Sequence, residues 1–255
     1  MKFIELTADN IEQEHICCAL ASKNSNIGVS AKKEWLSNQF KEGLKFIKLD
    51  VHGKVFIEYL PAEQAWNPIE APNYLFIDCL WVAGSHKGMG YAKELLQLCE
   101  KEAIASNKAG IIVMAGTKKT TYLSDKNFFI SQGFHTVDRT EYGIELLAKD
   151  LKEPAPTQPQ FKACCKEPIP NAKGIDIYFT AQCPFTSTYI QQIIPIIKEE
   201  STPIKIHQLK TKEEAQNHYA ATTTYSVFMD GKFVTNDILT VPKLLKWIDY
   251  YKHNC

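Results

Sequence analysis

The chain has 255 residues, which exceeds the usual length of one domain, roughly 100–200 residues, and predicts two domains. Its 29 basic and 29 acidic residues cancel, which argues against a nucleic-acid or anionic membrane surface. Because no apolar run approaches the roughly 20 residues that span a bilayer and the N-terminus lacks a signal-peptide pattern, we expect a cytoplasmic protein. Arg139 is the only arginine, so bidentate arginine clamps on phosphate are largely excluded.

The first third of the chain has the apolar periodicities of alternating strands and helices. In order, we predict a strand at 1–7, a helix at 10–21, a helix capped at Ser30, hairpin strands at 44–50 and 54–60, and a strand at 74–82. Three cysteines are expected to pack as small hydrophobic side chains. Cys17 and Cys79 lie in these apolar elements, and Cys99 lies in the helix that follows.

The run from Tyr74 to Ala103 combines a buried strand, a loop with two glycines and an amphipathic helix. The helix carries a core-facing stripe at i, i+3, i+4 and i+7, made of Ala92, Leu95, Leu96 and Cys99. Between strand and helix, Gly88 and Gly90 let the backbone turn tightly. Unpaired N–H groups at a helix start carry partial positive charge, so this junction predicts a site for a phosphate-bearing cofactor.

The loop SHKGMG, Ser85 to Gly90, resembles motif A of the GNAT family of acyl-CoA-dependent N-acetyltransferases. In that family the backbone amides of an Arg/Gln-x-x-Gly-x-Gly/Ala loop bind the CoA pyrophosphate. Gly88 and Gly90 match this pattern, whereas Ser85 stands where Arg or Gln is usual. The resemblance implies acetyl-CoA as co-substrate. It implies the following contact residues: Leu80, Trp81, Val82, Ser85, His86, Lys87, Gly88, Met89, Gly90, Tyr91, Ala92 and Phe129.

The remaining elements of the first domain fit the same family. A strand at 110–115, a short helix at 125–132 ending at Gly133, and strands at 134–139 and 142–149 complete the element order of a GNAT fold. The resemblance covers roughly residues 1–151 and implies an α/β (α+β) domain with a mixed central sheet. The segments IDCLWV, GSHKGMGYA and FFISQGF resemble the YoaP-type branch, whose members carry an additional C-terminal domain.

Acetyl transfer to an amine requires a base, a donor to the oxyanion and a proton for the leaving thiolate. The resemblance implies that backbone N–H groups of Leu80, Trp81 and Val82 face acetyl-CoA. Asp78, the only acid in that strand, is the first candidate for the base, and a cap or pair within the sheet explains it equally well.

The proton donor departs from the family pattern, because Phe129 stands where a tyrosine is usual. Tyr122 or Tyr142 could substitute, or water could supply the proton, or the domain binds acyl-CoA without turnover. Three further titratable residues are interpreted as surface residues: Glu58, His86 and His135. Trp66 and Trp81 are interpreted as core residues, with a substrate pocket as the alternative.

Residues 152–173 contain five prolines, which excludes a helix or inner strand and predicts a semi-rigid linker. Within it, Cys164 and Cys165 lie between Lys162 and Lys166, and nearby cations favour a reactive thiolate. Packing of this cysteine pair against a domain is the alternative interpretation.

Residues 174–255 restart the pattern as a second domain. Strands are predicted at 175–179, 204–209, 226–229 and 232–235, and helices through 198, at 213–219 and at 241–251. This order resembles a thioredoxin or glutaredoxin-like fold. The resemblance puts Cys183 in the position of the nucleophilic cysteine at a helix N-terminus, with Thr186 for the second cysteine and Tyr225 for the usual proline.

The leading interpretation is an acetyl-CoA-dependent N-acetyltransferase acting on a small-molecule or peptide amine. The second domain would shape substrate access or a homodimer. Asp78, Tyr142 and Cys183 are the candidate reactive residues. One alternative is a thiol-dependent or soft-metal-handling protein that uses Cys164, Cys165 and Cys183, although no regular metal-ligand spacing is present. Another is a non-catalytic acyl-CoA sensor.

Overall fold

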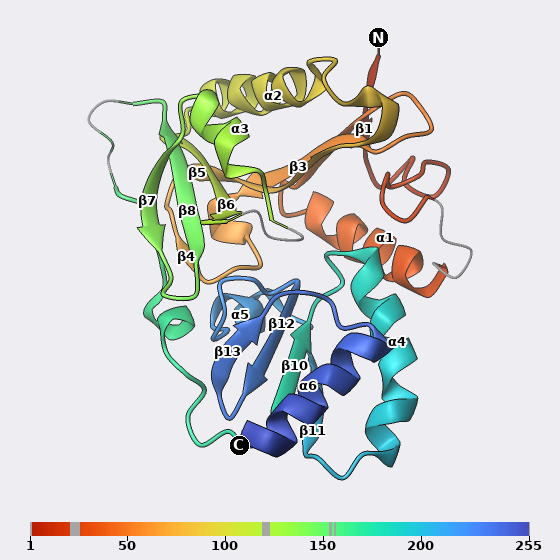
Figure 1. Cartoon of the computed structure of the whole chain (residues 1–255). Helices are drawn as coiled ribbons and strands as arrows, with labels where there is room; N and C mark the ends of the chain where they lie inside the picture. Colours follow the sequence, from red (N-terminus) through yellow and green to blue (C-terminus); the bar gives the residue numbers. More distant parts are fainter. Residues whose placement is uncertain (1, 21–25, 119–122, 153–154, 156, 255) are drawn as a thin grey trace. The chain divides into compact units, whose positions relative to one another are not determined.

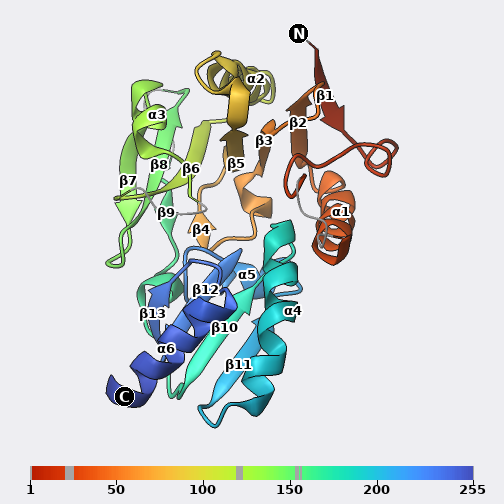
Figure 2. The ribbon, with the colours of Figure 1, turned by 45° about the vertical axis from the view of Figure 1, so that its right-hand side comes forward.

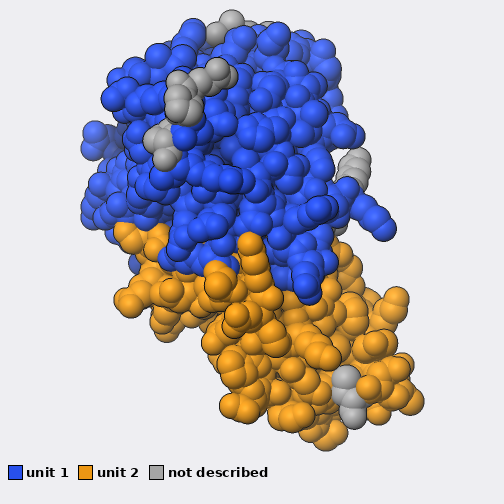
Figure 3. Space-filling model, turned by 90° about the vertical axis from the view of Figure 1, so that its left-hand side faces the viewer, with its two compact units in different colours: residues 1–20, 33–65, 69–162 blue, residues 21–32, 66–68, 163–255 orange. Residues whose placement is uncertain are grey.

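The computed structural model describes residues 2–20, 26–118, 123–152, 155 and 157–254 (Figure 1). The chain divides into two compact units, one of residues 1–20, 33–65 and 69–162 and the other of residues 21–32, 66–68 and 163–255 (Figure 3). Among the described helices, none combines the length and apolar character needed to cross a bilayer.

The first unit is built on a seven-stranded mixed sheet, as the sequence predicts. Its strands are β1 (Phe3–Leu6), β2 (Lys45–Leu49), β3 (Val55–Pro61), β5 (Tyr74–Val82), β6 (Gly110–Gly116), β7 (His135–Arg139) and β8 (Ile144–Asp150). They lie in the order β1-β2-β3-β5-β6-β8-β7. Only the β5–β6 pair is parallel, and the other pairs are antiparallel.

Helices α2 (Tyr91–Ala105) and α3 (Lys126–Ser131) contribute to the core of this sheet (Figure 2). Leu95, Leu96 and Cys99 are buried as the periodicity predicts, whereas Ala92 is half-buried and Tyr91 is buried in addition. The α3 helix starts at a capping residue, since the Asp125 carboxylate accepts hydrogen bonds from two backbone N–H groups of its first turn.

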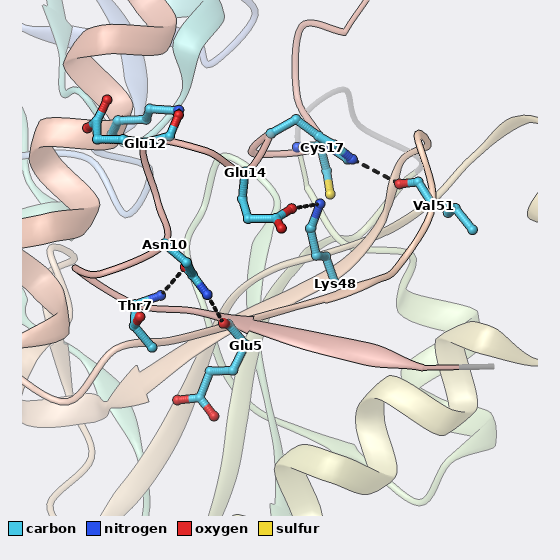
Figure 4. Close-up of polar contacts among 10 residues, drawn as sticks. Glu5, Thr7, Asn10, Glu12, Glu14, Cys17, Lys48 and Val51 are labelled. Atoms are coloured by element: carbon cyan, nitrogen blue, oxygen red, sulfur yellow. Dashed lines mark hydrogen bonds and ion pairs between the residues drawn. The ribbon is translucent and has the colours of Figure 1, made fainter.

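The N-terminal segment differs from the prediction. The described residues 10–20 form turns rather than a helix, and α1 (Asn26–Phe40) begins four residues before Ser30. Local hydrogen bonds compete with a helix here, because Asn10 accepts from the Thr7 N–H at 2.9 Å and donates to the Glu5 carbonyl at 2.9 Å (Figure 4). Cys17 has φ 61°, which also breaks a helix.

This segment is anchored to the sheet by an ion pair beneath it. The Lys48 ammonium, whose side chain is 2% exposed, lies 2.6 Å from the Glu14 carboxylate, which is 30% exposed (Figure 4). The hydrogen bond from Lys48 lowers the pKa of Glu14. Burial raises the pKa of the Cys17 thiol to about 12, so Cys17 is a packing residue, as predicted.

Substituting Glu14 with glutamine is expected to lower the free energy of unfolding by about 2 kcal/mol, because it leaves the Lys48 charge buried and unpaired. The Glu14 pKa is lowered in the folded state. The stability that Glu14 contributes is therefore fully present at pH values above the carboxyl's ordinary pKa, and it is lost as the pH falls through the lowered pKa. Glu5→Gln is the control, since the Glu5–Lys45 pair at 2.9 Å is more exposed, at 44% and 35%. Equal effects of the two variants in urea denaturation would contradict this assignment.

The segment predicted as a linker contains regular structure. Strand β9 (Gln160–Phe161) pairs antiparallel with β4 (Ile69–Glu70), and a 3-10 turn, η3, follows at Ala163–Lys166. Phe161 is 2% exposed, and its N–H donates to the Asp138 carboxylate at 2.7 Å. The prolines correctly predict that much of the segment has an irregular backbone. Because Phe161 packs within the first unit, residues 160–161 belong to that unit and are not part of a linker.

The second unit has a four-stranded sheet in the order β11-β10-β12-β13. Its elements are β10 (Ile175–Phe179), α4 (Pro184–Glu199), β11 (Ile204–Gln208), α5 (Lys212–Gln216), β12 (Tyr225–Met229), β13 (Lys232–Thr235) and α6 (Val241–Asn254). β10 is parallel to β11 and antiparallel to β12, and β12 and β13 form a hairpin. Apolar side chains of α4 and α6 pack with these strands in one core.

Candidate active site

The two parallel strands of the first sheet separate halfway along their length. β5 and β6 are paired from Tyr74↔Gly110 to Ile77↔Val113 and no further. Beyond that point β5 continues to Val82 against β3, while β6 continues to Gly116 against β8 and Ala115 also forms an isolated parallel bridge with Ser124 on its other edge. From Asp78 to Val82 the edge of β5 that faced β6 thus has no strand beside it among the described residues, and we call the place where the two strands separate the opening. Strand amides at such an edge can donate hydrogen bonds to a ligand.

The loop after β5 leads to a helix start that lacks a side-chain cap. Gly84, Gly88 and Gly90 have φ values of 65°, 76° and 87°, and a methyl group built on each would meet no atom within 4 Å. Gly90 is the N-cap of α2 and, as a glycine, supplies no side-chain cap to that helix. A helix start carries partial positive charge, and the open space at the glycines before it leaves room for an anion, so this cradle fits a phosphate group.

The side chains around this cradle are mostly exposed. Ser85, Lys87 and Met89 are exposed, whereas the half-buried His86 ring lies against Gly53 of the β2–β3 turn and 6.0 Å from the Tyr91 ring. The Lys54 ammonium lies 5.1 Å from the centre of the Trp81 ring, whose residue is 36% exposed. Backbone amides and lysines therefore supply the positive character of this site.

Asp78 occupies a β-bulge. Glu58 pairs with Cys79 and Tyr59 pairs with Ile77, so Asp78 is the extra residue on β5. A bulge re-aims side chains and is frequent next to active sites. Asp78 is half-buried and is the first residue beyond the last β5–β6 pair. Asp78 therefore lies where the opening starts.

Glu58 is buried, contrary to its interpretation as a surface residue. It is 1% exposed on β3, opposite Cys79 and next to the bulge at Asp78. The sequence offered a signal that was missed, since Glu58 interrupts the otherwise apolar run of residues 55–60, and a charged residue in a central strand is rare without a role. Two acidic residues thus lie on adjacent strands, Asp78 on β5 at the opening and Glu58 on β3, on the other side of β5.

The candidate proton donors fall in different places. Tyr142 is half-buried at the tip of the β7–β8 hairpin, where the Thr117 N–H donates to the Gly143 carbonyl at 2.9 Å. Since Gly116 pairs with Ile144, this tip adjoins the end of β6 that lies beside the opening. Tyr122 lies outside the described residues. Phe129 is 1% exposed and packs edge-on against Phe134, so we assign it to the core rather than to the cofactor.

Comparison with known proteins identifies the family of this chain. Residues 14–134 match the model of the acetyltransferase (GNAT) family, and residues 203–246 match the YoaP-like model. A Bacillus subtilis (strain 168) protein described as "Uncharacterized N-acetyltransferase YoaP" is 46% identical over 249 residues, which cover 98% of this chain and 99% of that protein. The chain belongs to the GNAT family, in its YoaP-type branch. It is therefore an N-acetyltransferase, and acetyl-CoA is its co-substrate.

Solved structures of GNAT proteins resemble the chain over part of its length. A putative GNAT acetyltransferase from Desulfovibrio desulfuricans is 11% identical, with a TM-score of 0.43, and covers 59% of this chain and 99% of its own. Aminoglycoside 6'-acetyltransferase type Ii is 15% identical, with a TM-score of 0.44, covering 60% and 98%. A Thermoplasma acidophilum PaiA N-acetyltransferase in complex with coenzyme A is 14% identical, with a TM-score of 0.40, covering 59% and 99%.

The cysteines of the second unit have distinct settings in this YoaP-type enzyme. Cys183 is half-buried at the N-cap of α4, and the Thr186 hydroxyl lies 2.8 Å from the Thr180 carbonyl oxygen and fixes the turn before the helix. Cys164 is half-buried, and Cys165 is fully buried near the Pro68 carbonyl. Among the described residues, no three His, Cys, Asp or Glu side chains are arranged to hold a metal ion. The soft-metal alternative thus gains no support.

Proposed function

We propose that acetyl transfer takes place in the opening between β5 and β6, onto the amine of a small molecule or a peptide. The observation that carries this proposal is the separation of β5 from β6 after Ile77, next to the uncapped start of α2. The separation leaves strand amides for the acyl group, and the helix start leaves amides for phosphate, within one connected segment.

The cradle would hold the pyrophosphate of acetyl-CoA through backbone N–H groups. The unfilled space at Gly88 and Gly90 supports this fit, since a side chain at either position would occupy it. Exposed Ser85 and Lys87 would add a hydroxyl donor and a positive charge at the loop. The N–H groups of Leu80, Trp81 and Val82 would donate to the thioester carbonyl oxygen, where negative charge develops during acyl transfer.

Asp78 would accept the proton of the attacking amine as its nitrogen bonds to the acetyl carbon. Its half-buried position at the opening gives it access to a substrate, whereas Glu58 is enclosed by the sheet. The enclosed Glu58 carboxyl group would position Asp78 and strengthen its basic character. As the carbon–sulfur bond breaks, the Tyr142 hydroxyl would supply a proton to the leaving thiolate.

An acceptor screen tests this proposal. Full-length protein is incubated with acetyl-CoA and with diamines, amino acids and short peptides in separate reactions, and released thiol is measured with a colorimetric reagent. We expect at least one amine to raise thiol release above the amine-free rate, and Tyr142→Phe to lower that release. If amines bind the protein loaded with acetyl-CoA but no thiol is released, the result would instead support the interpretation as a non-catalytic acyl-CoA sensor.

We further propose that residues 174–255 form a thioredoxin-like accessory domain that shapes substrate access. Its support is the order of the elements along the chain, from β10 and α4 to the β12–β13 hairpin and α6, with Cys183 at the first strand-to-helix junction. Thr186 occupies the place of a second cysteine, so disulfide exchange within a single motif has no partner thiol there.

Cys183→Ser is therefore expected to retain the rate of acetyl transfer within about twofold, because serine keeps the size of the side chain and the proposed reaction assigns its proton transfers to Asp78 and Tyr142, not to the candidate thiol of Cys183. Thiol-release kinetics with the best amine of the screen provide the measurement. Thr188→Ser, on the same helix, serves as the matched control for packing changes. A loss of activity in Cys183→Ser alone would show that the thiol participates.

A further inference from the structure

A lysine and a tryptophan form a pair beside the opening in the first unit. Lys54, immediately before β3, is half-buried, and its ammonium lies 5.1 Å from the centre of the Trp81 ring. The Lys54 carbonyl oxygen accepts the Ala83 N–H at 2.9 Å, which fixes Lys54 beside the end of β5. Trp81 is 36% exposed and belongs to the stretch of β5 that borders the opening. The Lys54–Trp81 pair therefore brings a positive charge and an aromatic surface next to the proposed site of acetyl transfer.

The Lys54–Trp81 pair and the start of α2 lie on opposite faces of the sheet. Leu80 and Val82 pack against the core that contains Tyr91, the first residue of α2. Trp81 alternates with Leu80 and Val82 along β5, so its side chain lies on the other face. Because the cradle leads into α2, the Lys54 ammonium lies across the sheet from the helix start. The anion that suits Lys54 is therefore a different one from the pyrophosphate of the cofactor.

The positive charge of Lys54 has no acidic partner close to it. Among the described residues, no carboxylate lies within 4.0 Å of its ammonium. Asp50, in the same hairpin, is exposed and forms no ion pair with Lys54 within that distance. Glu58, on the same face of β3, lies four residues away, which is about 13 Å of extended strand. A half-buried ammonium in this setting can bind a carboxylate of a ligand.

The acidic residues of the site lie toward the other end of the opening. Asp78, the proposed proton acceptor, precedes Trp81 by three residues on β5, which is about 10 Å of extended strand. Glu58 lies next to the bulge at Asp78, on β3. An acceptor aligned with β5 would thus meet acidic residues at one end and the Lys54 ammonium at the other. This arrangement complements a molecule that carries both an amine and an anionic group.

We propose that the acceptor is an amine that also carries a carboxylate about 10 Å away, as an extended tripeptide does. This inference rests on the proposed function. Lys54 would bind the carboxylate, and the exposed part of the Trp81 ring would contact the chain between the two charged ends. Lys54 and Trp81 would thus determine which acceptors bind, whereas the proton transfers belong to other residues.

A comparison of matched acceptors tests this proposal in the full-length protein. Triglycine, triglycinamide and glycine are each incubated with acetyl-CoA, and the released thiol gives kcat and KM. We expect kcat/KM for triglycine to exceed that for triglycinamide about tenfold or more, because the amide has no charge to pair with an ammonium. Glycine should also be a poor acceptor, since its carboxylate lies too close to its amine to reach Lys54.

Substitutions of Lys54 assign the effect to its ammonium group. Lys54→Met should raise KM for triglycine about tenfold while kcat stays within about twofold, because acceptor binding weakens and the proton transfers remain. Lys54→Arg restores a positive charge and should recover most of this loss. Lys101→Met is the matched control, since Lys101 is exposed on α2, and it should change neither constant.

Calorimetric titration separates this inference from the proposed function. N-acetyl-triglycine, the expected product, is titrated into full-length protein loaded with CoA, so that binding is measured without turnover. If no amine releases thiol, the proposed function fails, and this titration decides the inference. Binding that Lys54→Met abolishes would still support the carboxylate site, and no binding would overturn it.

Other results would overturn the inference and leave acetyl transfer in place. Equal kcat/KM for triglycine and triglycinamide would remove the role of the carboxylate, and glycine that reacts as well as triglycine would remove the spacing. Turnover of other amines without turnover of triglycine would exclude this class of acceptor. A Lys54→Met variant that weakens only the binding of acetyl-CoA would assign Lys54 to a phosphate of the cofactor.

Discussion

Asp78→Asn is expected to lower kcat for acetyl transfer about 10²–10³-fold, because an amide cannot accept the proton of the attacking amine. The affinity for acetyl-CoA should stay within about twofold, since the phosphate cradle is formed by the backbone after β5. Thiol-release kinetics give kcat, and calorimetric titration gives the Kd for acetyl-CoA.

Two matched variants separate a proton acceptor from a structural residue. Asp78→Glu restores a carboxyl group and should recover part of the activity, whereas Glu58→Gln removes a carboxyl group that is 1% exposed and should lower kcat less than Asp78→Asn. A Glu58→Gln variant that is inactive while Asp78→Asn keeps its activity would transfer the role of base to Glu58. If circular dichroism shows that Asp78→Asn and Glu58→Gln both lose their fold, the activity of Asp78→Glu decides whether a carboxyl group is needed at position 78.

Gly90→Ala should weaken acetyl-CoA binding about 30-fold or more. The added methyl group enters the open space at the start of α2, where the pyrophosphate would lie, and disturbs charge-assisted hydrogen bonds of about 1.5–3 kcal/mol each. Because no atom lies within 4 Å of the new group, the protein should still fold. Calorimetric titration with acetyl-CoA measures the change.

Gly133→Ala is the matched control for backbone strain. Gly133 has φ 88°, close to the 87° of Gly90, and lies at the end of α3, where a methyl group would meet only the flexible end of the Lys149 side chain, at 3.7 Å. Both variants carry the same cost for a non-glycine residue in left-handed conformation, about 1–2 kcal/mol. Weaker binding in Gly90→Ala alone would identify the cradle as the cofactor site. Equal weakening in the two variants would mean that strain, not the cradle, is responsible.

The sequence predicts the framework of the site because that framework follows local patterns. The apolar run of β5 and the stripe of Leu95, Leu96 and Cys99 are periodicities of single elements, and the structure confirms the strand and the stripe. Only residues 74–77 of β5 are buried, however, and Trp81 is 36% exposed, contrary to its interpretation as a core residue. The turn at Gly88 and Gly90 is likewise a property of neighbouring residues, and both glycines have positive φ.

The sequence did not predict the features that depend on pairing between distant segments. The bulge at Asp78 exists only in the register of β5 against β3, and the burial of Glu58 depends on the strands on either side of it. Residues 10–20 form turns despite their helical periodicity, because Asn10 makes local hydrogen bonds and Glu14 pairs with the buried Lys48. β9 depends on a partner strand that lies 90 residues away in sequence, from Glu70 to Gln160.

The most direct test of the account is the mass balance of one reaction. Full-length protein is incubated with acetyl-CoA carrying a ¹³C-labelled acetyl group and with the best amine of the screen, and mass spectrometry quantifies free CoA and labelled amide. We predict equal amounts of both products in the wild type and neither above background in Asp78→Asn. Tight binding of acetyl-CoA with no labelled amide from any amine, or undiminished amide formation in Asp78→Asn, would contradict transfer at the opening between β5 and β6.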